Sequence, residues 1–379
     1  MHPMLKPALR RGWRSRDTVQ FGVARAHAVV VGPLDTATGS FLELLDGTRG
    51  LPLLRQEARA LGLPEERADG LLDRLTAAGL LDDTRPGGPL APAASGPGPA
   101  LDRLRPDAAA LSVLHPEPGA AARLLAARRA MRVQVRGAGR VGAAVAAVLS
   151  SSGVGQVDVV DGGCVEPWDV APGGLSAEQI GERREVAARR LVRRAAPGPR
   201  PRPRAGEPPG GEPGLALVVI APRDGLAAYA PDPAAAEPLL ASGTPHLYAG
   251  VIEGTGVVGP LVLPGVTPCA GCAAAARAER EPTWPRMLAQ WRSGRRGSAP
   301  ACDTALATVV AGLTASRALA FLDGGLPAGA AARWELALPG LSWQAESVEA
   351  HPGCECGSAG RDDAVYASAA ERPHATMCG

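Results

Sequence analysis

The chain has 379 residues and is 46% hydrophobic, so it can bury the core of one large domain or of two smaller ones. Its formal net charge of +2 is smaller than that of a typical nucleic-acid-binding protein. The sequence shows neither a secretory signal nor an apolar run near the ~20 residues of a membrane helix, so we expect a cytoplasmic protein whose paired cysteines bind metal.

Residues 15–84 are predicted to form a small winged-helix-like α+β domain. Two β-prone runs, 18–23 and 27–31, end where glycine, proline and aspartate break the pattern. Leucine and phenylalanine residues then recur at helical spacing within 41–45 and 71–81. A hairpin followed by short helices is the order of elements in a winged helix.

Three segments have no core-forming pattern. Residues 85–107 are rich in proline and glycine and are interpreted as a linker. Residues 195–214 are interpreted as a surface insertion. Residues 358–379, which end in Cys378 and Gly379, are interpreted as a disordered tail.

Residues 108–357 alternate strands with helices. Strands are predicted at Arg132–Arg136, Gln156–Val160 and Leu215–Ile220, with an alanine-rich helix after the first and another helix near 176–194. Because parallel strands are joined by crossover helices, this alternation predicts a Rossmann-like, doubly wound α/β sheet.

The first of these strands runs directly into a glycine-rich turn. Gly137 permits the tight turn, Gly139 allows a phosphate to approach the backbone, and Gly142 allows the following helix to pack closely. Asp161 ends the next strand, where an acidic residue holds a ribose hydroxyl in nucleotide-binding folds. The alternative is that the turn only packs a helix against the sheet and binds nothing.

Four cysteines form two closely spaced pairs. Cys269 and Cys272 make a CxxC pair, and Cys354 and Cys356 make a CxC pair. Two such pairs predict a tetrahedral four-thiolate Zn²⁺ site, which is structural because it has no open position. It would fix the carboxyl-terminal segment to the domain. The alternatives are a redox CxxC or free cysteines, and His351 is a further ligand candidate that fits better in the turn.

Cys302 precedes an apolar helical run, 303–322. A helix amino terminus lowers the pKa of a thiol, so Cys302 is a weak candidate for a nucleophile. The alternative is a small side chain that packs where the helix begins.

Several motifs resemble one protein family. The sequence GAGRVGAAVAAVLSSSGVGQVDVVDGG resembles the nucleotide turn and second strand of ThiF/MoeB/HesA proteins, the bacterial relatives of ubiquitin-activating enzymes. The cysteine layout is similar to their zinc site, and ACDTALATVVAGL to their crossover helix. The stretch GPLVLPGVTPCAGCAAAARAEREPTWPRMLAQW resembles the branch that accompanies azole-forming cyclodehydratases in ribosomal peptide biosynthesis. In that branch a winged-helix-like peptide-recognition element comes first.

The resemblance implies a homodimer that binds ATP and Mg²⁺ and adenylates the carboxyl terminus of a carrier protein. The family's arginine falls near Pro172 in this chain, and its lysine near Arg184, since Lys6 is the only lysine present. The family's magnesium-binding aspartate falls near Arg223, with Asp224 as a weak candidate beside it. The adenylation site is therefore interpreted as degenerate.

Three functions follow from these patterns. In the first, the protein binds a precursor or leader peptide, or a small carrier protein, and acts as a scaffold for a modifying enzyme. In the second, it is an active adenylyltransferase in which Arg184 and Asp224 replace the family's lysine and aspartate. In the third, it is a winged-helix DNA-binding regulator, but acidic residues within 64–79 would repel phosphate, which makes nucleic acid an unfavoured partner.

Overall fold

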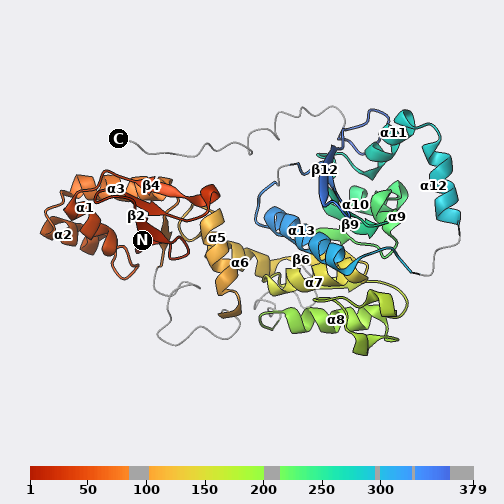
Figure 1. The fold of residues 1–379 in the computed structure, drawn as a ribbon, viewed down its shortest axis with the longest axis horizontal. Helices are drawn as coiled ribbons and strands as arrows, with labels where there is room; N and C mark the ends of the chain where they lie inside the picture. Colours follow the sequence, from red (N-terminus) through yellow and green to blue (C-terminus); the bar gives the residue numbers. More distant parts are fainter. Residues whose placement is uncertain (85–101, 200–213, 295–298, 327–328, 359–379) are drawn as a thin grey trace. The chain divides into compact units, whose positions relative to one another are not determined.

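The computed structural model of the protein describes residues 1–84, 102–199, 214–294, 299–326 and 329–358. These residues form two compact units, one within Met1–Ala127 and one that begins at Arg128 (Figure 1). Most of the expected linker, most of the expected insertion and the tail from residue 359 lie outside the described residues.

The amino-terminal unit contains two small antiparallel sheets. One pairs β1 (Pro3–Leu5) with β5 (Leu81–Asp83), and the other has the order β2 (Arg11–Trp13), β3 (Val19–Phe21), β4 (Val29–Val31). Strands β1 and β2 lie before residue 15, where the sequence placed the start of this domain. A strand of three residues is too short to show the alternation by which strands are recognised.

Three helices pack against the three-stranded sheet: α1 (Thr36–Glu43), α2 (Leu51–Ala60) and α3 (Glu65–Ala77). Their core joins Phe21 of β3 to Phe41, Leu54 and Leu75 of the three helices. Helix α2 was not predicted. Pro52 lies in its first turn, where proline is tolerated because the first N–H groups of a helix have no partner within the helix.

A proline in the first turn of a helix also explains why the expected linker ends earlier than predicted. Helix α5 (Arg105–Leu114) begins inside the range 85–107 and belongs to the first unit. Pro106 lies in its first turn, so the proline that indicated a linker instead opens a helix. Helix α6 (Ala120–Ala130) follows.

The chain's only lysine is buried in this unit. Lys6 donates from Nζ to the carbonyl oxygens of Ser112 and His115, at the carboxyl-terminal end of α5, the latter at 3.1 Å. Burial lowers the pKa of Lys6, while the charges of Asp82 and Glu117 oppose that shift. Lys6 therefore caps α5 and ties it to the end of β1.

We expect Lys6→Met to destabilise the amino-terminal unit, because it leaves buried carbonyl groups without a donor, at about 1–3 kcal/mol for each unsatisfied group. Urea unfolding of the full chain measures this loss. Arg10→Met, at an exposed position nearby, should leave the midpoint unchanged. Equal midpoints for the two variants would contradict a capping role for Lys6.

The second unit is built on one seven-stranded sheet with the order β12-β11-β10-β9-β8-β6-β7. Its strands are β6 (Arg132–Arg136), β7 (Gln156–Val160), β8 (Leu215–Ile220), β9 (His246–Ile252), β10 (Thr255–Val262), β11 (Ala332–Ala337) and β12 (Ser342–Ser347). The first three coincide with the predicted strands. Strands β7, β6, β8 and β9 are parallel, whereas β9 to β12 pair antiparallel, so the sheet is mixed.

Helices cover both faces of this sheet. They are α7 (Arg140–Ser151), α8 (Arg184–Ala195), α9 (Gly225–Tyr229), α10 (Pro233–Ala241), α11 (Ala270–Arg280), α12 (Trp284–Ser293) and α13 (Thr304–Leu322). On one face, Val133 and Leu247 of the sheet share a core with residues of α7, α8 and α13. On the other face, Tyr248 packs with Leu240 of α10 and with the cysteine cluster. Adjacent residues of β9 thus serve opposite cores, as strand geometry requires.

Helix α13 is long and apolar enough to cross a membrane by length and composition, contrary to the expectation from the sequence. It lies beside α7 (Figure 1), and Leu306, Val310 and Leu322 are buried in the core of the second unit. Its apolar character is therefore that of a core helix.

Candidate functional site

The glycine-rich turn joins β6 to α7, as the sequence predicts. Gly137 has φ +113°, and a Cβ placed there would lie 1.9 Å from the carbonyl oxygen of Ala221. A Cβ at Gly142 would lie 2.2 Å from the carbonyl oxygen of Gly137, and one at Gly139 would lie 2.9 Å from Cγ of Arg223. Backbone packing alone accounts for Gly137 and Gly142, whereas Gly139 makes room for an arginine side chain.

Asp161 lies at the end of β7 and faces the turn. Its Oδ2 accepts a hydrogen bond of 2.7 Å from the backbone N–H of Ala138, and its Oδ1 lies 3.2 Å from Nε of Arg184. The carboxylate expected to hold a ribose is therefore engaged by the turn and by a guanidinium group.

Arg184 begins α8, and its side chain is only 9% exposed. It donates to the carbonyl oxygens of Gly162 and Cys164, and its Nη1 lies 3.4 Å from Oδ2 of Asp169. Short helices, η2 (Pro167–Asp169) and η3 (Ala177–Gln179), hold the chain between β7 and α8. The charge of this arginine is thus paired within the protein, while its buried Nε makes no hydrogen bond among the described residues.

Arg223 follows β8 and is paired in the same way. Its Nε donates to Oδ1 of Asp169 at 2.6 Å, and its Nη2 donates to Glu166. Burial alone would lower the pKa of Arg223, but these two acidic partners raise it. We call Asp161, Glu166, Asp169, Arg184 and Arg223 the charge cluster.

Three carboxylates surround two guanidinium groups in the charge cluster. A triphosphate needs uncompensated positive charge, and magnesium needs carboxylate oxygens that are not already paired. Arg140, in the turn itself, is also engaged, because it donates to the carbonyl oxygens of Trp168 at 2.9 Å and Cys302 at 2.7 Å. These residues do not fit ATP with Mg²⁺ in the arrangement that the structure shows.

Asp224 caps the short helix α9 by accepting from the N–H of Leu226 at 3.0 Å. It also lines a cavity of about 810 Å³ beside the charge cluster. Trp284 and Trp291 of α12 line this cavity too. We call it the large cavity.

Cys302 does not have the environment of a reactive thiol. Burial raises its pKa, against the lowering effect of Arg140. The residue that caps α13 is Asp303, whose carboxylate accepts from the N–H of Leu306 at 3.0 Å. The prediction of a lowered pKa fails because Cys302 stands before the cap and packs against the core.

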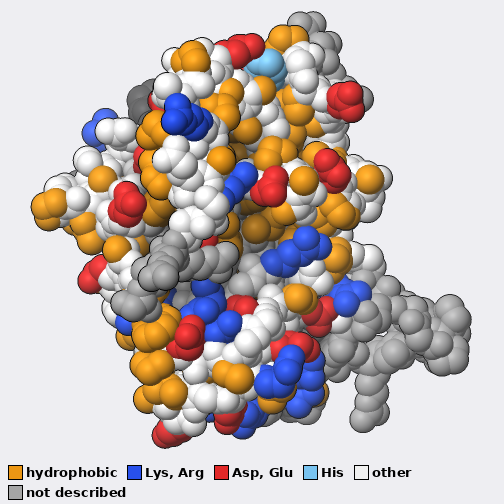
Figure 2. Space-filling model, turned by 90° about the vertical axis from the view of Figure 1, so that its right-hand side faces the viewer, with side chains coloured by type: hydrophobic (Ala, Val, Ile, Leu, Met, Phe, Trp, Pro, Cys, Tyr) orange, Lys and Arg blue, Asp and Glu red, His pale blue; other side chains and the backbone are white. Residues whose placement is uncertain are grey.

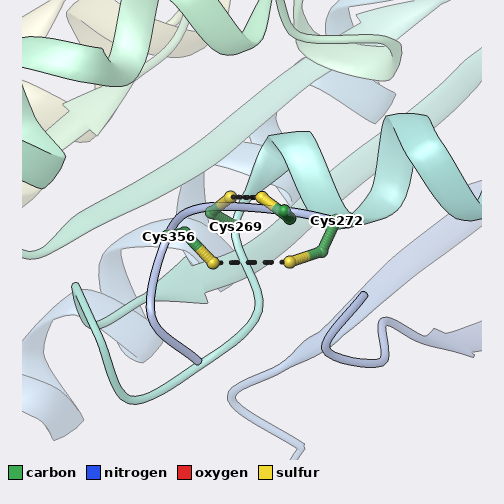
Figure 3. A group of neighbouring side chains, drawn as sticks. Cys269, Cys272 and Cys356 are labelled. Carbon is green, nitrogen blue, oxygen red and sulfur yellow. Dashed lines mark hydrogen bonds between the residues drawn. The ribbon is translucent and has the colours of Figure 1, made fainter. Parts of the chain in front are cut away.

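The four paired cysteines come together, as predicted. The Sγ atoms of Cys269 and Cys354 are 3.6 Å apart, those of Cys272 and Cys356 are 3.5 Å apart, and all four lie within 4.8 Å of one another. In Figure 3 the sulfur atoms of Cys269, Cys272 and Cys356 point toward one centre. Zinc–sulfur bonds near ~2.3 Å in a tetrahedron place sulfurs about 3.8 Å apart, so these residues fit Zn²⁺.

The surroundings of the cysteines explain how they are positioned. Cys269 caps α11, where its sulfur accepts from the N–H of Gly271 at 3.2 Å. His351 lies outside the group, since its Nδ1 accepts from the N–H of Gly353 at 3.1 Å and its Nε2 lies 3.0 Å from Glu279. His351 therefore stabilises the turn that carries Cys354.

The second unit thus combines an α/β sheet, a glycine turn after its first strand and four cysteines placed to hold a metal ion. The model of the ThiF family matches residues 118–357, well over half of the chain, so the protein belongs to the ThiF family. A search of proteins with curated functions gave no match.

Solved structures share the fold over nearly the whole chain. The crystal structure of E. coli MccB with ATP is 15% identical, with a TM-score of 0.68, and the match covers 94% of this chain and 99% of that one. The microcin C7 biosynthetic enzyme MccB, in complex with N-formylated MccA, is 14% identical, with a TM-score of 0.66 and coverage of 94% and 100%. The heterocyclase TruD is 18% identical, with a TM-score of 0.59, and the match covers 94% of this chain and 43% of TruD.

Proposed function

We propose that this protein binds a precursor peptide or a small carrier protein through its amino-terminal unit and acts as a scaffold for a modifying enzyme, with an adenylation site that has degenerated. The degeneration of the adenylation site is inferred from the charge cluster, in which Asp169 and its acidic neighbours already neutralise Arg184 and Arg223. MccB, a protein of the same fold, has been crystallised with MccA, which supports a peptide as the partner. We further expect a cytoplasmic homodimer.

The peptide site is proposed at the outer edge of β4. Gly22 donates to Arg10, and Arg14 donates to Thr18, so alternate residues of β3 direct their backbone groups toward β2. By the same alternation, the backbone N–H and C=O of Gln20 point toward β2. Val30 of β4 lies opposite Gln20, so its own N–H and C=O point away from β3, toward the open side of β4. The described residues place no strand on that side of β4.

An extended peptide would extend the sheet at this edge by adding a strand. Helix α3 is tied to the start of α1, a few residues after β4, because Arg67 of α3 lies 2.9 Å from the carboxylate of Asp35, which caps α1. A winged-helix-like arrangement of this kind would place α3 along the bound peptide. The peptide would gain main-chain hydrogen bonds from Val30 and side-chain contacts from α3.

Val30→Pro is expected to weaken peptide binding at least about tenfold, because it removes an outward-facing donor without removing a bond to β3. Binding is measured by fluorescence anisotropy on the full chain, with labelled peptides from the small proteins encoded beside it. Arg11→Pro, at an outward-facing position on the opposite edge strand β2, should bind normally. Equal affinity in both variants, or no saturable binding to the parent, would refute the proposed site.

A second candidate is an active adenylyltransferase, favoured by the fold shared with MccB, which has been crystallised with ATP, and by the large cavity beside the glycine turn. Carrier-dependent exchange of pyrophosphate into ATP would establish this activity. We expect no such exchange. We also expect calorimetry to detect no binding of ATP–Mg²⁺ to the parent; binding to the parent that disappears in Asp161→Ala would instead support the adenylyltransferase.

A further inference from the structure

A smaller cavity of about 320 Å³ lies in the second unit and is lined by residues of α11 and α12. Figure 2 shows the side of the molecule that lies at the right of Figure 1, where α11 and α12 are labelled. Most of its wall is apolar and contains alanines of α11, such as Ala270, Ala273 and Ala274, together with Pro260 and Leu288. This volume lies within the range of small-molecule sites. An apolar pocket of this size accepts an aliphatic group of a few carbons.

One charged side chain in this wall is held rigidly and is incompletely paired. The guanidinium group of Arg277 lies 3.5 Å from the ring centre of Trp284, and its Nη1 donates to the hydroxyl of Tyr229 at 3.3 Å. Its Nε is buried and has no hydrogen-bond partner among the described residues. The nearest carboxylate, that of the half-exposed Glu281, is 3.8 Å away.

The two other guanidinium groups of the wall, those of Arg280 and Arg333, each have a carboxylate within 3.0 Å. Glu346 lies 3.0 Å from Arg280 and 2.7 Å from Arg333, and Glu279 is paired with His351 at 3.0 Å. Nε of Arg333 also has no hydrogen-bond partner among the described residues, but its Nη2 lies 2.6 Å from Glu335 and 2.7 Å from Glu346. Arg277, whose carboxylate partner is 3.8 Å away, is therefore the guanidinium group of this wall with the most room for another anion. A fixed, partly desolvated guanidinium group binds a carboxylate through charge-assisted hydrogen bonds.

We infer that this cavity binds an organic monocarboxylate with an apolar body, its carboxylate on Arg277 and its aliphatic part against the alanines of α11. Arg277, Tyr229 and Trp284 also line the large cavity, so such a ligand would lie at the partition between the two cavities. The ligand is either a free acid or the carboxyl-terminal residue of a polypeptide. This site is independent of the edge of β4.

The test titrates isocaproate into the zinc-loaded full chain by calorimetry. We expect saturable binding, weakened about tenfold to a hundredfold when isocaproamide replaces the acid or when Arg277→Gln replaces the parent. Arg286→Gln, which alters an exposed arginine of α12 outside this wall, should bind as the parent does. Equal binding of acid and amide, or full binding by Arg277→Gln, would overturn the inference.

Two further arms locate the ligand and its source. Ala274→Phe fills the smaller cavity and should abolish binding, whereas Ala299→Phe, in the large cavity, should not. The reverse result would place the ligand elsewhere and overturn the assignment. A glycine-rich peptide that ends in leucine should compete with isocaproate if the source is a polypeptide, and should fail to compete if it is a free acid.

Discussion

Cys272→Ser is expected to abolish stoichiometric zinc binding and to lower the thermal stability of the second unit substantially. Cys272 is fully buried, and a serine hydroxyl cannot replace its thiolate as a zinc ligand. Structural zinc binds with apparent free energies of about 10–16 kcal/mol in small peptides, which is comparable to the total stability of about 5–15 kcal/mol of a folded domain. Metal content by mass spectrometry and calorimetric unfolding measure the two effects.

The matched control is Cys164→Ser, which changes an exposed cysteine outside the cluster and should retain zinc and stability. A chelator should reproduce the effect of Cys272→Ser in the parent and leave that variant unchanged. Because the ligands must be thiolates, acidification should release the metal. A Cys272→Ser variant with full zinc content would show that the four sulfurs do not share one metal.

The strands and the cysteine group that the sequence predicted are those that depend on residues close together in the chain. Strands β6, β7 and β8 begin and end where predicted, because parallel buried strands are short β-branched runs between turns. The cysteine group was predictable because the two cysteines of each pair are already close together within one turn. The fold therefore has only to bring the two turns together. The antiparallel strands β9 to β12 were missed, although Glu253 and Gly254 mark the turn between β9 and β10.

Other features depend on contacts that no local pattern shows. Pro106 of α5 was counted with the linker and α2 was not predicted, yet the prolines of both helices lie in first turns, where proline does not interrupt a helix. Arg223 is far from Glu166 and Asp169 in the sequence, and only the fold brings them together. The sequence showed that the family's charged residues were changed at these positions, but not that the new arginine would be neutralised internally.

Asp169→Asn should destabilise the second unit and reduce the repulsion of polyphosphate by the charge cluster, since two carboxylates rather than three then face two guanidinium groups. The Asp169 side chain is 3% exposed, lies 2.6 Å from Nε of Arg223 and 3.4 Å from Nη1 of Arg184, and accepts from the N–H of Glu166 at 2.9 Å. Removing one partner of a buried ion pair costs about 3–5 kcal/mol when the remaining charge is left uncompensated. Because Arg223 keeps Glu166 and Arg184 keeps Asp161 as partners, we expect the loss to fall at or below the lower end of this range. Urea unfolding should show a loss of this order.

Inorganic pyrophosphate should restore part of that stability, because an anion that binds only the folded state stabilises it by mass action. The parent should show no such response, since its guanidinium groups are already paired. Asp224→Asn, beside Arg223 in the sequence, is the matched control, because asparagine caps α9 about as well as aspartate does. If the parent itself were stabilised by pyrophosphate as strongly as Asp169→Asn, the internal carboxylates would not exclude phosphate, and the adenylyltransferase would become the better hypothesis.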